Sequence, residues 1–162
     1  MTPHPDLRLS SEVAAALAAG RPVVALETAI VTHGMPPPVN LSTARAAEAE
    51  IRAHGAVPAT IAVFDGKLVA GLSDAELVAL AALPAGVRKA SAKDLGAAIA
   101  AAATAGTTVA ATMRIAHLAG IRVFATGGIG GGHRGRILYT PDTAAGRTRV
   151  RAAVRTPRLQ TT

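Results

Sequence analysis

The sequence predicts one α/β domain, a three-layer α/β/α arrangement in which helices cover both faces of a mainly parallel or mixed sheet. Half of the 162 residues are hydrophobic but only 2% are aromatic, so Ala, Val, Leu and Ile must fill the core. Short β-branched runs alternate with Ala-rich helical segments, a pattern typical of a sheet buried between layers of helices. The length suits one compact domain rather than two.

The first part of the chain predicts a helix, a strand, a stiff loop and a second helix. Their expected ranges are 11–18, 22–31, 32–38 and 42–54. Ser10 or Ser11 can cap the first helix, and Gly55 follows the second. Three consecutive prolines, Pro36 to Pro38, prevent a helix within the loop.

The next part predicts a hairpin followed by helices and strands. The expected ranges are strands at 59–64 and 68–72, a helix from 74 to about 84, a strand at 87–90, a helix at 91–105, a helix beginning near 107 and a strand at 121–125. Asp65-Gly66 is a hairpin turn signal, and Ser73 with Glu76 forms a capping-box pattern. A glycine loop over residues 126–135 follows the last strand.

Charge and cysteine content narrow the classes of function. From Arg134 onward the sequence contains seven Arg and one acidic residue, Asp142. The preceding residues carry ten basic and nine acidic side chains, so most of the net charge of +7 lies in the tail. A nucleic-acid interface would depend on that tail alone, without interleaved aromatic side chains for base stacking, and we expect none. The chain has no cysteine, so neither a disulfide nor a thiolate metal site can form.

The sequence also favours a cytoplasmic protein with no membrane partner. Its first ten residues contain no apolar segment of signal-peptide length. The uncharged run between Asp94 and Arg114 consists mostly of Ala, Gly and Thr, which gain little free energy on transfer into lipid. We therefore expect two buried helices of a soluble domain in that run.

Two kinds of charged side chain are candidates for chemistry by position alone. Glu27 stands inside an otherwise apolar strand, where its carboxyl could act as a general acid or form a structural ion pair at the strand end. Lys89 and Lys93 could be substrate-facing amines or solvated surface residues.

Other residues suggest contacts with an anion. Thr107 and Thr108 at a helix start could bind a phosphate, and so could the backbone of the glycine loop. His133 in that loop could be a general base or a phosphate contact; the alternative is an ordinary polar loop residue. The glycine spacing does not fit a dinucleotide-binding loop.

Four sequence blocks together resemble one known family. They are Val24 to Thr28 with Thr32 to Pro36, Gly55 to Ala62, Thr107 to Met113, and Phe124 to Gly130 with His133 to Gly135. Their order and spacing are similar to those of the pseudouridine-5'-phosphate glycosidase family, also called the indigoidine synthase A-like family. The resemblance covers residues 8–135 and corresponds to the N-terminal part of a family member.

The resemblance implies a homotrimeric α/β/α enzyme that reversibly cleaves the C–C glycosidic bond of pseudouridine 5'-phosphate to uracil and ribose 5-phosphate, with a divalent cation such as Mn²⁺. By position, Glu27 matches the family's proton donor, and His133 matches the histidine of its glycine loop. Lys89 and Val109 match substrate-binding residues. In the family mechanism the ribose ring opens and C1 forms an imine with a lysine. Uracil then leaves by cleavage of the C–C bond that joins it to C1.

Beyond Gly135 the sequence departs from the family's pattern. Asp142 is the candidate metal ligand, displaced by one residue, and the family's Ser-Ala-Asp segment does not follow it. No lysine follows Lys93, so the imine-forming residue is not found. Residues 136–162 form a divergent Arg-rich tail whose composition is typical of disorder. We expect a domain that is incomplete relative to the family and prone to instability or oligomerisation.

Three hypotheses for function follow. The first is a C-glycosidase (lyase) acting on pseudouridine 5'-phosphate, with activity limited by the departures after Gly135. The second is a non-catalytic remnant that binds a sugar phosphate or joins a related subunit as an assembly partner. Binding of ribose 5-phosphate without turnover would distinguish the second from the first. The third, nucleic-acid binding by the basic tail, requires binding that is lost with residues 136–162 and weakens steeply with salt.

Overall fold

The computed structural model describes residues 4–82 and 86–127. The strands are β1 (Leu7–Leu9), β2 (Val23–Leu26), β3 (Val57–Phe64), β4 (Lys67–Ala70), β5 (Arg88–Ala90), β6 (Ala105–Thr107) and β7 (Val123–Ala125). The helices are α1 (Ser11–Ala18), α2 (Val39–Ala53), α3 (Asp74–Ala82), α4 (Leu95–Ala100) and α5 (Val109–Leu118). A π-helical turn, Ile30–Gly34, follows β2, and a 3₁₀ turn, Ala92–Asp94, precedes α4.

β3 is the central strand of the sheet, because it pairs with β2, β4 and β6. The main strand order is β1-β4-β3-β2-β7, and β6 pairs with both β3 and β5. Along one edge of β3, β4 pairs antiparallel with residues 61–64; along the other, β2 pairs in parallel with residues 57–60 and β6 pairs antiparallel with residues 62–63. Because β2 runs with β3 and β6 runs against it, the carboxyl ends of β2 and β6 point toward each other.

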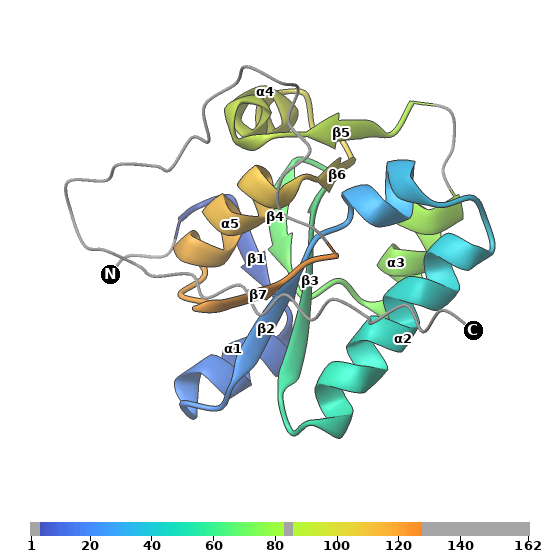
Figure 1. Cartoon of the computed structure of the whole chain (residues 1–162). Coiled ribbons are helices and arrows are strands. Elements are labelled where there is room, and N and C mark those ends of the chain that lie inside the picture. The colour runs from blue at the N-terminus through green and yellow to red at the C-terminus, as the bar shows by residue number, and fades with distance from the viewer. Residues whose placement is uncertain (1–3, 83–85, 128–162) are drawn as a thin grey trace, which may run out of the picture.

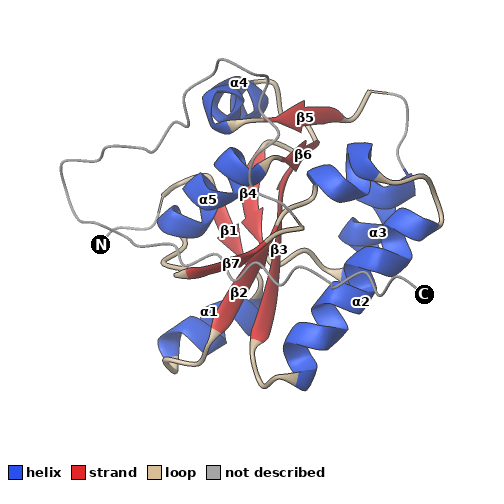
Figure 2. Ribbon diagram, in the orientation of Figure 1, coloured by secondary structure: helices blue, strands red, loops and turns tan. Residues whose placement is uncertain are grey.

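Helices lie on both sides of this sheet (Figure 1). On one side, α1, α4 and α5 pack over β2 and β3 around a core that includes the fully buried Ala25, Ile61 and Ile115. On the other side, α2 packs against β3, and α3 packs against α2 and the π-helical turn around Val31 and Leu77. Figure 2 shows the strands between these helices. The predicted α/β/α architecture with a mixed sheet is confirmed.

The local signals for α1 and the hairpin are confirmed. Ser10 caps α1 by accepting a hydrogen bond from the Val13 N–H at 3.2 Å. Asp65 and Gly66 both have positive φ, at 48° and 72°, as a two-residue turn between twisted strands requires. A Cβ on Gly66 would also lie 2.9 Å from the Ala102 Cα. Glycine is therefore needed there for both backbone conformation and space.

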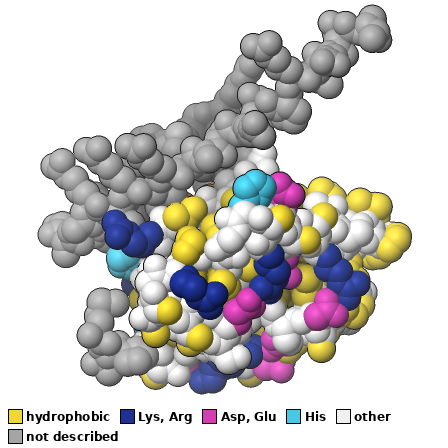
Figure 3. All heavy atoms as spheres, turned by 90° about the horizontal axis from the view of Figure 1, so that it is seen from below, with side chains coloured by type: hydrophobic (Ala, Val, Ile, Leu, Met, Phe, Trp, Pro, Cys, Tyr) yellow, Lys and Arg dark blue, Asp and Glu magenta, His cyan; other side chains and the backbone are white. Residues whose placement is uncertain are grey.

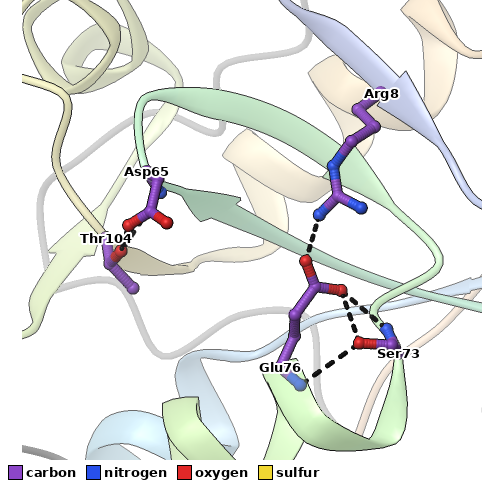
Figure 4. A network of polar contacts seen from close by, with 5 residues as sticks. All are labelled: Arg8, Asp65, Ser73, Glu76 and Thr104. Atoms are coloured by element: carbon purple, nitrogen blue, oxygen red, sulfur yellow. Dashed lines mark hydrogen bonds and ion pairs between the residues drawn. The ribbon is translucent and has the colours of Figure 1, made fainter.

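The capping box at α3 is confirmed and extends to β1. The Ser73 N–H donates to the Glu76 carboxylate at 2.8 Å, and the Glu76 N–H donates to Ser73 Oγ at 3.3 Å. Arg8 of β1 pairs with the same carboxylate (Figure 4). The other contact in that view joins Thr104 to Asp65 of the hairpin, at 3.3 Å.

The strand predicted to reach Val31 is shorter, because β2 ends at Leu26. The Thr28 carbonyl accepts hydrogen bonds from the N–H groups of Val31 and Thr32, each at 3.0 Å, and the chain enters the π-helical turn. Glu27 therefore lies directly after β2 and not inside a strand.

The helix predicted over residues 91–105 is also shorter, because α4 ends at Ala100. Ala102 has a φ of 46°, which an α-helix cannot contain, and β6 then forms beside β3 and β5. The Ala-rich run favours a helix by propensity, and tertiary pairing overrides it. β1 was missed because three residues are too few to show a periodic pattern.

Several charged side chains on the described surface form pairs of opposite charge. Arg45 contacts Asp74 through two hydrogen bonds, at 2.9 and 2.8 Å, and Arg52 of α2 pairs with Glu12 of α1. Basic and acidic side chains lie beside one another over the face seen in Figure 3. Among residues 4–82 and 86–127, no helix has the length and hydrophobicity needed to cross a membrane.

Candidate active site

The ends of four strands meet in one region. β2 and β6 abut along β3, β7 runs parallel to β2, and β5 runs parallel to β6. The Thr108 N–H donates to the Ala90 carbonyl at 3.0 Å and holds the ends of β5 and β6 together. We call the junction between the ends of β2 and β6, residues 27–28 and 107–108, the seam. Carboxyl ends of strands in α/β sheets are common ligand sites.

Three buried threonines join the two sides of the seam, and we call Thr28, Thr107 and Thr112 the threonine cluster. The hydroxyls of Thr28 and Thr107 each donate to the Ile61 carbonyl at 2.7 Å, and the Thr107 N–H donates to Thr28 Oγ1 at 2.9 Å. Thr112 of α5 donates to Thr107 Oγ1 at 3.0 Å. All three side chains are fully buried. Hydroxyl groups therefore supply hydrogen bonds where the strands abut.

The π-helical turn packs directly on β6 at Gly106. A Cβ there would lie 2.1 Å from Thr32 Oγ1, so only glycine permits this approach. The Thr32 hydroxyl donates to the Thr28 carbonyl at 3.2 Å, and its oxygen lies 2.7 Å from Nδ1 of His33. The contact with Thr32 therefore orients the ring of His33, which is exposed.

Glu27 is half-buried, and its carboxyl is oriented by a hydrogen bond from the residue that follows β7. Its Oε1 accepts a hydrogen bond from Thr126 Oγ1 at 2.5 Å, and Thr126 follows β7. Within the described residues no ion pair involves Glu27, so the alternative of a structural salt bridge finds no partner there. The carboxyl is thus held in direction while part of it stays accessible.

The two predicted substrate-binding residues lie on elements that border the seam. Val109 is the first residue of α5, and its half-buried side chain packs on the core. Lys89 is exposed on β5, in register with Gly106 of β6. Lys93 is exposed in the 3₁₀ turn.

The phosphate contact expected at Thr107 is corrected by the structure, whereas the contact expected at Thr108 stays a prediction. Thr107 is fully buried and its hydroxyl is used within the threonine cluster. Thr108 is the N-cap of α5, and its side chain accepts from the Ala111 N–H at 3.5 Å. The threonine cluster itself was not predicted; the one signal for it is a threonine placed next to the end of an apolar strand.

A metal site is not formed by the described residues. His133 and Asp142 lie outside them, so their roles stay predictions. In residues 4–82 and 86–127, no three His, Asp or Glu side chains gather where they could hold an ion. Glu27 offers one carboxylate, and Thr126 already occupies one of its oxygens. The described residues alone do not fit the Mn²⁺ ion that the resemblance implies.

One open hollow, of about 660 Å³, lies away from this region. It is formed by the turns that precede β2 and β7, and its polar side chains are Arg21 and Arg122. Because it sits at the amino ends of these parallel strands, it does not include the seam.

Comparison with known proteins settles the family. A family model described as "Indigoidine synthase A like protein" matches residues 12–148. The chain belongs to this family. It is 58% identical over 142 residues to the pseudouridine-5'-phosphate glycosidase of Rhodospirillum centenum, and 61% identical over 129 residues to the protein of that name from Jannaschia sp.. These alignments cover 88% and 80% of this chain but 43% and 42% of the relatives, so the chain spans less than half of their length.

Two solved structures share the fold. The prealnumycin C-glycosynthase AlnA, in complex with ribulose 5-phosphate, has a TM-score of 0.72 and 47% identity, over 82% of this chain and 42% of its own. An indigoidine synthase A-like protein from Thermotoga maritima has a TM-score of 0.72 and 33% identity, over 88% and 47%. The family match runs to residue 148 and so enters the range assigned to the divergent tail; the boundary at Gly135 stays a prediction.

Proposed function

We propose that the chain carries the N-terminal part of a pseudouridine-5'-phosphate glycosidase site, with Glu27 as proton donor and with Lys89 and Val109 as contacts to the sugar phosphate. The observation that carries the proposal is the meeting of Glu27, β5 and the start of α5 at the seam. The relatives named for this activity support it, because they are similar to the chain over 142 and 129 of its residues.

The chemistry gives Glu27 a defined task. Cleavage of the bond between C1 of ribose and C5 of uracil leaves a carbon that must gain a proton, and Glu27 can supply it from a carboxyl that Thr126 orients. A carbon leaving group has no lone pair to protonate beforehand, so the acid alone is insufficient and the ribose must be activated as an imine. Lys89 and Lys93 are the last lysines of the chain, and Lys89 lies on β5, whose end is hydrogen-bonded to Thr108 of the seam.

A second candidate, sugar-phosphate binding without turnover, is favoured by one observation. No lysine follows Lys93, although the family mechanism places its imine-forming lysine further along the chain. Lys89 and the start of α5 would then bind ribose 5-phosphate, and Glu27 would contact the sugar without transferring a proton.

The direct test incubates the folded chain with uracil, ribose 5-phosphate and Mn²⁺ and looks for pseudouridine 5'-phosphate by chromatography. Product that is lost in Glu27→Gln but kept in Glu50→Gln, an exposed carboxylate of α2, supports the glycosidase. Product that survives in Glu27→Gln would remove Glu27 from the mechanism.

Binding is measured separately, by calorimetry with ribose 5-phosphate. Lys89→Ala is expected to weaken binding about tenfold or more, whereas Lys67→Ala on the hairpin should not change it. Saturable binding without product supports the second candidate. A folded chain that neither binds nor turns over contradicts both.

The metal, assembly and compartment belong to the same proposal. Mn²⁺ binding would depend on Asp142, and calorimetric titration of the chain with Mn²⁺ should lose its signal in Asp142→Asn. His133 would contact the opened ribose from the glycine loop.

Sedimentation analysis tests the homotrimer that the resemblance implies. We assign the enzyme to the cytoplasm, with a small-molecule substrate.

A further inference from the structure

The π-helical turn after β2 carries a histidine that the proposed function does not use. Single π-helical turns are rare and frequently occur at functional sites. The turn packs closely on β6, because Thr32 Oγ1 fills the space in which a Cβ of Gly106 would lie. The same oxygen lies 2.7 Å from Nδ1 of His33. One side chain, Thr32, therefore both contacts the sheet and orients the imidazole ring.

Buried contacts hold the turn in place from its other side. Asn40 of α2 is 1% exposed, and its Nδ2 donates to the carbonyls of Val31 at 3.0 Å and Ala81 at 2.9 Å. Its Oδ1 accepts from the Leu41 N–H at 2.8 Å. The turn is thus fixed between β6 on one side and α2 and α3 on the other. His33 therefore has a defined place beside the sheet.

Strand register places Lys89 on the same face of the sheet as this turn. Lys89 of β5 pairs with Gly106 of β6, and paired residues of neighbouring strands direct their side chains to one face. Thr32 occupies that face at Gly106. On the opposite face, Ala90 and Ala105 belong to the core. Figure 1 shows the turn, in blue, next to β6. The amine of Lys89 and the ring oriented by Thr32 thus border the same position of β6.

The elements that border this position supply positive charge. The π-helical turn, β5, β6 and the first residue of α5 contain no Asp or Glu. Their basic side chains are those of His33, Arg88 and Lys89. The next carboxyls along the chain, Glu27 and Asp94, already accept hydrogen bonds from Thr126 and from the Ser91 N–H. Positive charge together with side-chain donors favours an anion, and the oxygens of a phosphate group can accept from two side chains at once.

We infer that His33 is a phosphate contact of the candidate active site, and that its imidazole and the Lys89 ammonium bind the phosphate group of the sugar phosphate together. In the imidazolium form both ring nitrogens donate, so Nδ1 keeps its contact with Thr32 while Nε2 donates to a phosphate oxygen. A neighbouring phosphate dianion favours that form of the ring. The inference rests on the proposed function, because it adds a residue for the same ligand, but it requires no proton transfer by Glu27.

The test measures binding of ribose 5-phosphate to the full chain by calorimetry, alone and in competition with inorganic phosphate. His33→Ala removes the ring, and His33→Phe keeps a ring without donors. Both are expected to raise the Kd for ribose 5-phosphate, and the inhibition constant for phosphate, about tenfold. His54→Ala is the matched control, since His54 is an exposed histidine that follows α2, at the end of that helix away from Asn40, and it should bind as the wild type does.

Circular dichroism first establishes that each variant is folded. Unchanged affinity in His33→Phe would overturn the inference, because the ring nitrogens would then have no role. A loss of affinity for ribose 5-phosphate with unchanged competition by phosphate would assign the ring to the sugar and overturn the phosphate contact.

The outcomes also separate this inference from the proposed function. Binding that depends on His33, without formation of pseudouridine 5'-phosphate, supports the inference and counts against catalysis. Product formation with the same KM for ribose 5-phosphate in the wild type and His33→Phe overturns the inference and leaves the proposed function standing. Failure of the wild type to bind ribose 5-phosphate would overturn both.

Discussion

At the residue scale, Gly106 and Gly96 differ in what surrounds them. A Cβ on Gly106 would overlap the Thr32 hydroxyl, whereas nothing lies within 4 Å of a Cβ on Gly96. Gly106→Ala is therefore expected to lower the free energy of unfolding by about 1–3 kcal/mol. Gly96→Ala should raise it by about 0.5–1 kcal/mol, because alanine stabilises a helix relative to glycine. Urea denaturation of both variants measures the difference, and equal effects would contradict the close approach at β6.

The threonine cluster gives a second prediction at this scale. Thr28→Val keeps the shape of the side chain but leaves the buried Thr107 N–H without its acceptor. We expect a loss of about 1–3 kcal/mol in the free energy of unfolding. Thr104→Val, which removes only an exposed contact between the residue before β6 and Asp65, should cost less than about 0.5 kcal/mol. Chemical denaturation again provides the measurement, and a neutral Thr28→Val would show that the seam does not depend on hydroxyl groups.

At the element scale, Glu76 of α3 both caps its own helix with Ser73 and contacts Arg8 of β1. Burial acts to raise the pKa of Glu76, but hydrogen bonds from Ser73 and Arg8 outweigh it, and the pKa lies below its ordinary value of 4.5. Hydrogen bonding by Arg52 likewise lowers the pKa of Glu12. A carboxyl whose pKa is lower in the folded state stabilises the fold above its ordinary pKa, and that stability is lost as the pH falls toward the folded value.

We therefore expect the free energy of unfolding to fall as the pH is lowered from about 5.5 to 3, and to fall less steeply in Glu76→Gln. Ser73→Ala should cost about 1 kcal/mol at neutral pH through loss of the cap. Denaturation at several pH values checks both. A wild-type profile no steeper than that of Glu76→Gln would show that this carboxyl does not contribute.

The elements that the sequence predicted are those with local signals. Ser10, the Asp65-Gly66 turn and the Ser73 capping box are each decided within four residues of chain, and all three are confirmed. β6 and the early end of β2 depend on pairing between segments far apart in the chain, which no local pattern reports. The same reason explains the site: Glu27 could be singled out as a carboxyl in an apolar context, whereas its partner Thr126 required the register of β7 against β2.

At the scale of the whole molecule, the core rather than surface charge is expected to hold the fold. The ion pairs Arg45–Asp74, Arg52–Glu12 and Lys67–Asp6 each include a side chain that is about half exposed or more. Pairs of this kind contribute about 0–1 kcal/mol each and are screened by salt. Raising NaCl to about 0.5 M, where screening is strong, should therefore change the free energy of unfolding by no more than about 1–2 kcal/mol. A larger loss in calorimetric or urea unfolding would mean that the ion pairs act as a network.

At the seam, the adjacent residues Glu27 and Thr28 have different roles. The side chain of Thr28 is committed to the sheet, since it bonds β3 and β6, while the carboxyl of Glu27 bonds only Thr126 in the contacts described above. If Glu27 is the proton donor proposed above, a substitution there alters reactivity while the frame keeps its shape, and a substitution at Thr28 would do the reverse. Over evolutionary time, such a division lets a lineage acquire a new reaction by exchanging side chains beside the seam, without redesigning the fold that presents them.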